Sequence, residues 1–354
     1  MTHTAHRRWI IAGATAAIGL PAALSAVPAA AGGELSNRVF TTGTATMTQP
    51  DDITLLDGTI YVVWQNGVGP SGQPSSTGAT DSTVVAYTTS GRRVARWRIA
   101  GHTDGLAADS ARHRLLVTVN EDGNSSLYTI SPEAPAADQV KHYQYNLNPL
   151  PHGGGTDAVS VYRGTILISA SAPTVAGGPA VYRARLEAGG MAVLQPVFFD
   201  DSPARVANVD TSSSGTWVAL ALTDPDSNVV VPGSSPRFAG DFMLNSQGDE
   251  EQIYVDGAPG PTPKLSVLDL SQAVDDTAWV TNADGTLLVT DSVDNEVFAV
   301  RGEFDPGAAY VAVTPRDANN PINLPNYLGR LNLHTGEVSP AMTTIQAKGL
   351  LFIP

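Results

Sequence analysis

The sequence predicts an all-β fold, a six-bladed β-propeller of four-stranded blades whose ring is closed by pairing of the N- and C-terminal segments. Aspartates recur in similar contexts along the 354-residue chain and are 52, 53, 53 and 66 residues apart, which is close to the length of a propeller blade. No segment has a helical periodicity of useful length. The recurring aspartates are Asp52, Asp104, Asp157, Asp210 and Asp276.

Each aspartate begins a unit that contains several short β-type runs. The first run ends in a tight turn such as LLDG or YRG, and a stronger β run follows, for example TIYVVW or TILISA. In the units of Asp210 and Asp276 these stronger runs are TWVALAL and TLLVTD. A third and a fourth run follow in most units, such as STVVAYTT and RVARWRIA in the first. Four short strands in a unit of this length are typical of a propeller blade.

The C-terminus contains the start of a sixth unit, QAKGLLFIP, in which Lys348 stands in the aspartate position. One strand cannot form a blade, so we expect Ser36–Met47 to supply an outer strand that closes the ring. Residues 32–50 are therefore assigned to the closing segment and residues 51–354 to the propeller. Five or seven blades are less favoured alternatives, and the stretch between Asp276 and Lys348 has room for extra strands.

Residues 1–31 resemble a signal peptide, with a charged start, an apolar run and an Ala-x-Ala ending at Ala29 and Ala31. Arg7 and Arg8 also resemble the twin-arginine export pattern. We therefore expect the mature protein to be secreted or extracytoplasmic. No later segment is apolar for long enough to predict membrane insertion, and the chain has no cysteine.

The charge of the chain narrows the choice of partners. Its formal net charge is −14, and loss of Arg7 and Arg8 with the leader would make it −16. Such an acidic protein is not expected to bind nucleic acid. A cation, a small molecule or an extracellular protein remains as a possible partner.

The recurring aspartates predict a cation site. In a propeller, the first strand of each blade borders the central channel, so Asp52, Asp104, Asp157, Asp210 and Asp276 would form a ring, with Lys348 in the sixth place as a ligand-binding residue. Carboxylates gathered in this way repel one another, and a divalent cation such as Ca²⁺ would neutralise them. The alternative is that each aspartate accepts N–H groups of its own loop. Lys348 favours the ring, because a lysine cannot act as such an acceptor.

Loops near the same channel mouth supply further candidates. Asn120 and Glu121 are candidate metal ligands, although their NEDG segment is also typical of a plain hairpin turn. Asn66 and His102 are candidate ligand-binding residues. His152, in the segment PHGGGTD, is a candidate catalytic acid or base. Solvent-exposed loop histidines without a function are the alternative for both histidines.

The units DGTLLVTDSVDNEVFAV and DGLAAD…RLLVTVNEDGNSSLYTI resemble the NHL-repeat, gluconolactonase-like and virginiamycin B lyase-like group of six-bladed propellers over roughly Pro50 to Pro354. This resemblance implies a divalent cation at the channel mouth, held by Glu, Asn and Asp side chains, and in the lyases combined with a histidine. The present ring departs from the lactonase pattern because it consists almost entirely of aspartate. We therefore expect an exported propeller that binds a ligand, with a metal-dependent lactonase-like hydrolase or lyase as the alternative.

Overall fold

The computed structural model describes residues 35–209, 211–315 and 325–354. The chain divides into Met1–Ala31 and Gly32–Pro354, and the description below concerns the second unit. The predicted signal peptide and Asp210 lie outside the described residues. The predicted all-β class is confirmed, because the helices of the described part are three short 3₁₀ turns: η1 (Ser110–Arg112), η2 (Ala136–Asp138) and η3 (Gln247–Asp249). No helix among the described residues is long and apolar enough to cross a bilayer.

The first half of the unit forms two sheets built from antiparallel meanders. The first sheet has four strands in chain order: β2 (Pro50–Leu56), β3 (Thr59–Trp64), β4 (Asp81–Tyr87) and β5 (Arg93–Ala100). The second sheet has eight strands and consists of two meanders whose outer strands β9 and β13 pair in parallel. Its first meander contains β6 (Thr103–Asp109), β7 (Arg114–Val119), β8 (Ser126–Ile130) and β9 (Val140–Tyr145), and its second contains β10 (Gly155–Tyr162), β11 (Thr165–Ser171), β12 (Pro179–Leu186) and β13 (Met191–Phe199).

The second half forms three more sheets. One contains the meander β16 (Pro225–Val230), β17 (Phe242–Ser246), β18 (Glu251–Asp256) and β19 (Lys264–Asp269). A hairpin of β14 (Pro203–Val206) and β15 (Trp217–Ala219) extends this sheet, because β14 pairs in parallel with β19. The next contains β20 (Val274–Trp279), β23 (Ala309–Val313), β24 (Tyr327–Leu331) and β25 (Val338–Met342). The last contains β26 (Leu350–Ile353), β21 (Thr286–Asp291), β22 (Glu296–Arg301) and β1 (Ser36–Thr42).

The two ends of the described chain belong to this last sheet. Strand β1 pairs with β22, and β26 pairs with β21, so the β21–β22 hairpin lies between the terminal strands. The terminal segments are therefore joined in one sheet as predicted, but they pair with the β21–β22 hairpin and not with each other. Phe40 of β1, Trp64 of β3 and Leu288 of β21 share one buried cluster, which packs the last sheet against the first.

Two parts of the predicted repeat are wrong. The run TLLVTD was expected to pair with the strand that contains Asp276, but β21 pairs with β26 and β22, while β20 pairs with β23. The run TWVALAL was expected to be the second strand of the fourth unit, but β15 belongs to the added β14–β15 hairpin. Alternation of apolar residues identifies a strand without identifying its partner, and this explains both errors.

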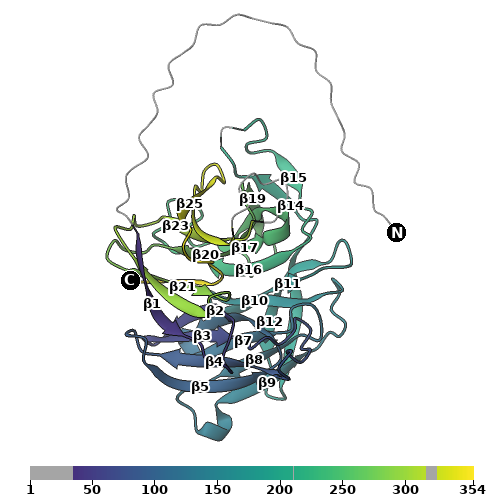
Figure 1. Cartoon of the computed structure of the whole chain (residues 1–354). Coiled ribbons are helices and arrows are strands. Elements are labelled where there is room, and N and C mark those ends of the chain that lie inside the picture. Colours follow the sequence, from purple (N-terminus) through teal and green to yellow (C-terminus); the bar gives the residue numbers. More distant parts are fainter. Residues whose placement is uncertain (1–34, 210, 316–324) are drawn as a thin grey trace, which may run out of the picture. The chain divides into compact units, whose positions relative to one another are not determined.

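The first strands of the meanders border one another around the centre of the unit. Contacts join β2 to β6, β6 to β10, β10 to β16, β16 to β20, β20 to β26 and β26 to β2. Figure 1 shows β2, β10, β16 and β20 gathered near this centre. These first strands, which we call the inner strands, position the site described next.

Candidate functional site

Five inner strands contain the same irregularity, and each places an aspartate within it. Pairing with the second strand shifts in register at residues 50–53, 103–106, 156–159, 225–228 and 274–277. Such a bulge leaves residues outside the ladder and turns a side chain in a new direction. In each strand the first residue that leaves the regular pairing is an aspartate: Asp51, Asp104, Asp157, Asp226 and Asp275.

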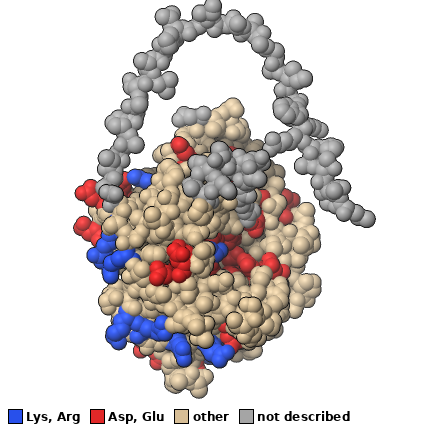
Figure 2. All heavy atoms as spheres, viewed as in Figure 1, with Lys and Arg blue, Asp and Glu red and all other residues tan. Residues whose placement is uncertain are grey.

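These aspartates line a cavity of about 200 Å³ between the inner strands. Lys348, which precedes β26, also lines it and is the only lysine or arginine among the lining residues that the structure describes. Figure 2 shows acidic side chains gathered near the centre of the viewed face, whereas most basic side chains lie toward its edge. The carboxyl side chains of the cavity wall are Asp51, Asp52, Asp104, Glu121, Asp157, Asp226, Asp275 and Asp276.

The structure changes the composition of the predicted ring. Asp104, Asp157 and Lys348 lie at equivalent positions of the cavity wall, but Asp51 and Asp275 occupy the positions expected for Asp52 and Asp276. Asp226 of β16 supplies the aspartate of the fourth meander, the place predicted for Asp210. The sequence contained a signal for this, because Pro225-Asp226 repeats the Pro50-Asp51 pair at the start of β2, whereas the regular spacing pointed to Asp210.

Asp52 and Asp276 join neighbouring inner strands. Asp52 accepts a hydrogen bond from the backbone N–H of Ile53 at 2.6 Å and another from Leu106 of β6 at 2.6 Å. Asp276 accepts in the same way from Thr277 at 2.6 Å and from Leu350 of β26 at 2.7 Å. The predicted alternative, in which each aspartate accepts N–H groups of its own loop, applies to these two residues only in part, because each accepts one N–H from the next residue of its own strand and one from a neighbouring inner strand. Asp52 and Asp276 thereby link β2 to β6 and β20 to β26.

Lys348 provides a fixed positive charge on one side of the cavity. Its ammonium lies 2.9 Å from Oδ2 of Asp275 and 3.6 Å from Oδ1 of Asp51. Burial lowers the pKa of Lys348, but the charges of Asp275, Asp51 and Asp226 outweigh burial and raise it well above its ordinary value. Lys348 is therefore charged at physiological pH, although it cannot balance all the carboxyl groups of the wall.

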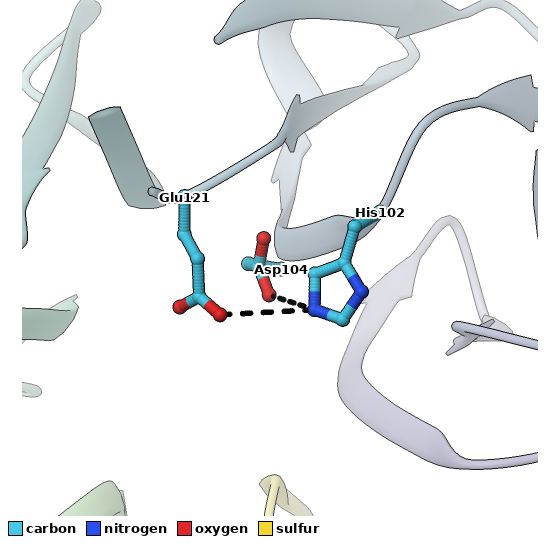
Figure 3. Close-up of side chains that lie close together, drawn as sticks. All are labelled: His102, Asp104 and Glu121. Carbon is cyan, nitrogen blue, oxygen red and sulfur yellow. Dashed lines mark ion pairs between the residues drawn. The ribbon is translucent and has the colours of Figure 1, made fainter. Parts of the chain in front are cut away.

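A histidine and two carboxyl groups meet on another side of the cavity (Figure 3). Nε2 of His102, which precedes β6, lies 3.0 Å from Oδ1 of Asp104 and 3.8 Å from Oε1 of Glu121. Nδ1 of His102 lies 2.5 Å from the carbonyl oxygen of Val68, so an Nδ1–H group donates to this carbonyl. The hydrogen bond at Nδ1 thus fixes the orientation of the imidazole, and Nε2 faces the two carboxyl groups.

The pKa values of the wall reflect burial and crowded negative charge. Burial raises the pKa of Asp51 to about 7 despite the opposing charge of Lys348. Burial and the charge of Asp104 raise the pKa of Glu121 to about 8. Burial lowers the pKa of His102, but its hydrogen bond to Asp104 and the charges of Asp104 and Glu121 raise it to about 9. Without a further positive charge, part of this wall must hold protons at neutral pH.

Burial is also the largest cause of the raised pKa values of the aspartates on β10 and β16. It raises the pKa of Asp157 well above its ordinary value, and the neighbouring charge of Asp226 adds to this effect. The pKa of Asp226 is raised by burial and by the charge of Asp275. The cavity is therefore a place where an added cation would release protons.

Three predicted site residues have other roles in the structure. His152 is fully buried and is not part of the cavity wall; its Nδ1 lies 2.7 Å from the hydroxyl of Tyr182 and its Nε2 lies 2.7 Å from the carbonyl oxygen of Gly155. Burial lowers the pKa of His152, which fits a neutral ring that donates to the carbonyl and accepts from the hydroxyl. Both nitrogens are occupied, so the geometry does not favour the predicted catalytic role.

Asn120 and Asn66 hold loops in place. Asn120 accepts from the N–H of His102 at 3.0 Å and donates to the carbonyl of Asn124 at 3.0 Å, and it is absent from the cavity wall. Asn66 donates to the carbonyl of Asp81 at 2.9 Å and accepts from the N–H of Thr48 at 3.2 Å. Asn120 therefore supports His102, whereas the structure does not bring Asn66 to the cavity.

The loop after β3 makes hydrogen bonds to the histidine side of the site. Its Val68 is buried and accepts from His102, and the carbonyl of Pro70 accepts from the N–H of Asp122 at 3.1 Å. Gln65, at the start of this loop, donates to Oδ1 of Asp104 at 3.3 Å. The start of the loop after β3 is therefore part of the support of His102 and Asp104.

The fold and the site together define an all-β protein of the propeller class with an acidic cavity between its inner strands.

No protein-family model matches the chain, and no curated protein matches it. Among solved structures, the periplasmic gluconolactonase of Pseudomonas aeruginosa is similar with a TM-score of 0.50 and 12% identity, over 91% of this chain and 99% of that chain. A protein provisionally named a gluconolactonase is similar with a TM-score of 0.49 and 10% identity, over 90% and 84% of the two chains. A streptogramin B lyase has a TM-score of 0.36 and 8% identity, over 76% and 98%.

The gluconolactonase of Pseudomonas aeruginosa is a β-propeller, which is the class of fold that the sequence predicted. At 12% identity this likeness concerns the fold alone. The β-propeller class and its gluconolactonase-like neighbours are therefore confirmed, while activity must be argued from the site.

Proposed function

We propose that this protein is a six-bladed propeller that binds a divalent cation, and with it a small ligand, at the mouth of its central channel. The six blades are inferred from the inner strands, because each of the six heads an antiparallel meander or, for β26, the edge of the closing sheet. Contacts also join these strands in a closed order. The eight-stranded sheet then represents two blades joined at their outer strands.

The orientation of His102 is the observation that carries the cation proposal. Metal-binding histidines usually donate their other ring N–H to a carbonyl or carboxylate, and His102 donates Nδ1–H to Val68. One ligand atom from each of His102, Asp104 and Glu121 lies within 4.8 Å of the others. Oδ2 of Asp104 is buried without a hydrogen-bond partner. Such a buried acceptor has a desolvation cost that a cation would offset.

The donor set fits a divalent cation of more than one kind. Carboxylate oxygens suit the predicted Ca²⁺, whereas an imidazole nitrogen beside two carboxylates also suits Zn²⁺ or Mn²⁺. When bound, the cation would supply positive charge that attracts an oxygen atom of the ligand. His102, Asp104 and Glu121 would hold it, while Lys348 partly neutralises Asp275 and Asp51.

A small molecule is the partner that we propose, in preference to an extracellular protein. The polar groups converge on a cavity rather than on a flat surface, and such sites suit small ligands. Lactonase-like hydrolysis is the second candidate, favoured by the fold shared with a gluconolactonase and by a buried His–carboxylate pair at the cavity. We also propose that the protein acts outside the cytoplasm, on the basis of the signal-peptide pattern in residues 1–31.

Calorimetric titration of the chelator-treated protein with Ca²⁺, Zn²⁺ and Mn²⁺ tests the proposal. We expect His102→Ala, Asp104→Asn and Glu121→Gln each to weaken binding of the preferred cation at least about tenfold, the effect of losing one ligand or its support. His113→Ala is the matched control, because His113 lies on the surface and pairs with Asp57 at 2.8 Å. The proposal is wrong if no cation binds the parent protein, or if the site variants bind as the control does.

Lactonase activity is tested separately by following acid release from simple γ- and δ-lactones in the presence of the preferred cation. Activity that falls in the Asp104→Asn variant would support a hydrolase. Cation binding without turnover of any lactone would leave the binding function and remove the enzymatic one.

A further inference from the structure

A row of exposed arginines follows the outer strand of the first sheet. Strand β5 has the sequence RVARWRIA, and its Arg93, Arg96 and Arg98 are exposed. The chain as a whole has a formal net charge of −14, so this concentration of positive charge runs against its overall composition. Figure 2 shows basic side chains gathered on the viewed face where Figure 1 places β5.

A bulge brings all three arginines onto one face of the sheet. The pairing of β5 with β4 shifts in register, so that Arg93 stands opposite Tyr87 while Arg96 stands opposite Val85. Residues that stand opposite each other in an antiparallel pair share a face, and Arg98 shares the face of Arg96 because it is two residues further along. Tyr87 and Val85 belong to the buried cluster that packs the first sheet against the last. The three arginines therefore lie on the face that is turned toward the last sheet.

The last sheet contributes a further arginine from the other side. Arg38 of β1 is exposed and stands opposite Ala299 of β22, which belongs to the same buried cluster. Arg38 therefore lies on the face of the last sheet that is turned toward the first. The two sheets meet nearby, because the rings of Phe40 and Tyr87 lie 5.9 Å apart and a side chain at Gly91 would collide with the carbonyl oxygen of Phe40. The arginine face is the name that we give to Arg38, Arg93, Arg96 and Arg98.

Carboxylates do not balance the charge of the arginine face. Among the described residues, its ion pairs amount to one, between Arg98 and Asp81 at 2.5 Å. The Arg98 side chain is 79% exposed, so solvent screens this pair. At physiological ionic strength, exposed charges more than about 8 Å apart are largely screened from one another. A partner on the arginine face is therefore attracted by the local positive charge and is hardly repelled by the net negative charge of the chain.

Protection of an exposed sheet edge does not by itself explain this arrangement. Charged side chains on an edge strand do prevent pairing with other chains. Strand β25 is also the outer strand of its sheet, however, and its sequence VSPAM contains no charged residue. Edge protection would also not require arginines of two different sheets to lie on facing sides.

We propose that the arginine face binds an acidic polysaccharide, a linear chain that carries carboxylate groups at regular intervals. Planar guanidinium groups bind carboxylates through paired hydrogen bonds. Arg96 and Arg98 are two residues apart along a strand, which places their backbones roughly 7 Å from each other and lets one extended polymer contact both. This surface is separate from the cavity, and the proposal does not depend on the cation site.

The surroundings of the arginine face favour a hydrophilic polymer over a lipid bilayer. Segments that lie in a membrane interface insert Trp, Phe or Leu side chains beside their basic residues. Trp97, between Arg96 and Arg98, is only 8% exposed and belongs to the buried cluster on the opposite face of the sheet. The large hydrophobic side chains that β1 and β5 expose are the valines Val39 and Val94. A bilayer would therefore gain little apolar contact here.

Biolayer interferometry with immobilised polygalacturonate tests the proposal. The matched probe is the fully methyl-esterified polymer, which has the same backbone without the charge, and vesicles that contain phosphatidylglycerol represent an anionic bilayer. The full chain is used at about 50 mM NaCl, where screening is weak, with chelator present so that no divalent cation bridges protein and polymer. The arginine-face variant is Arg38→Gln with Arg96→Gln. The control is Arg163→Gln with Arg185→Gln, which removes the same charge at two exposed positions elsewhere.

We expect the parent protein to bind polygalacturonate at least about tenfold more tightly than the methyl ester. The arginine-face variant should lose about tenfold in affinity through two missing charge-assisted contacts, while the control stays within about twofold of the parent. The proposal is overturned if polygalacturonate does not bind the parent, if the methyl ester binds equally well, or if the two variants lose affinity equally. Binding of the vesicles without binding of polygalacturonate would also overturn it, and would assign the arginine face to a bilayer.

Discussion

Replacing Lys348 by methionine should destabilise the protein, because the substitution leaves the carboxylates around Lys348 without their positively charged partner. The ammonium lies 2.9 Å from Asp275, and at an effective dielectric constant of about 20 this pair is worth roughly 6 kcal/mol before desolvation is subtracted. The Lys348 side chain is 35% exposed, so solvent screens part of the attraction. Removal of one partner of a more deeply buried pair costs about 3 to 5 kcal/mol, and we therefore expect a loss of about 2 kcal/mol here.

Urea denaturation followed by tryptophan fluorescence, at pH 8 and in the presence of chelator, measures this loss. The double variant Lys348→Met with Asp275→Asn should recover part of the free energy of unfolding, because it removes the carboxylate that was left unpaired. Lys348→Met should also bind the divalent cation more tightly than the parent. A single variant as stable as the parent under these conditions would refute the electrostatic reasoning.

Three further results are expected. His152→Ala should lower the free energy of unfolding by about 2 to 3 kcal/mol through the loss of buried hydrogen bonds and packing, and leave cation affinity unchanged in the calorimetric titration. Asp52→Ala should weaken cation binding as well as stability, because it frees the N–H of Leu106 beside Asp104; unchanged affinity would separate this carboxyl from the site. Burial and the nearby Asp269 raise the pKa of Glu251 to about 7 from 4.5. Ionisation of Glu251 therefore lowers the free energy of unfolding as pH rises from about 4.5 to 7, and the full loss persists above that range. Glu251→Gln should therefore stabilise the protein by about 1 to 2 kcal/mol at pH 8, after allowance for partial exposure, and by much less at pH 4.5; equal thermal shifts at the two pH values would contradict this.

Much of the architecture could be predicted from local patterns. Short alternating runs, frequent tight turns and the absence of helical periodicity determine an all-β class, because these signals depend on neighbouring residues only. The recurrence of an aspartate at the start of a strand similarly pointed to Asp104 and Asp157, and the lysine of the last unit pointed to Lys348. All three residues lie on the cavity wall.

Register and strand partners could not be obtained in this way. Asp51 and Asp52 are adjacent in the sequence, and only the bulge of β2 gives one the ring position and the other a bond to β6. The regular interval that selected Asp210 passed over Asp226, because the added β14–β15 hairpin interrupts the repeat. Spacing along the chain does not reveal such an insertion until the strands are paired.

The sequence by itself determined that this protein is built of repeated β units and that carboxyl groups accompany their first strands. Only the tertiary structure decided which carboxyl groups converge, because convergence depends on bulges, on contacts between blades and on the closing sheet that unites β1 with β26. It also separated the two histidines for which the sequence left the same alternative, a loop histidine without a function. His152 is enclosed by partners of its own, whereas the carbonyl of Val68, from a different sheet's loop, turns His102 toward Asp104 and Glu121.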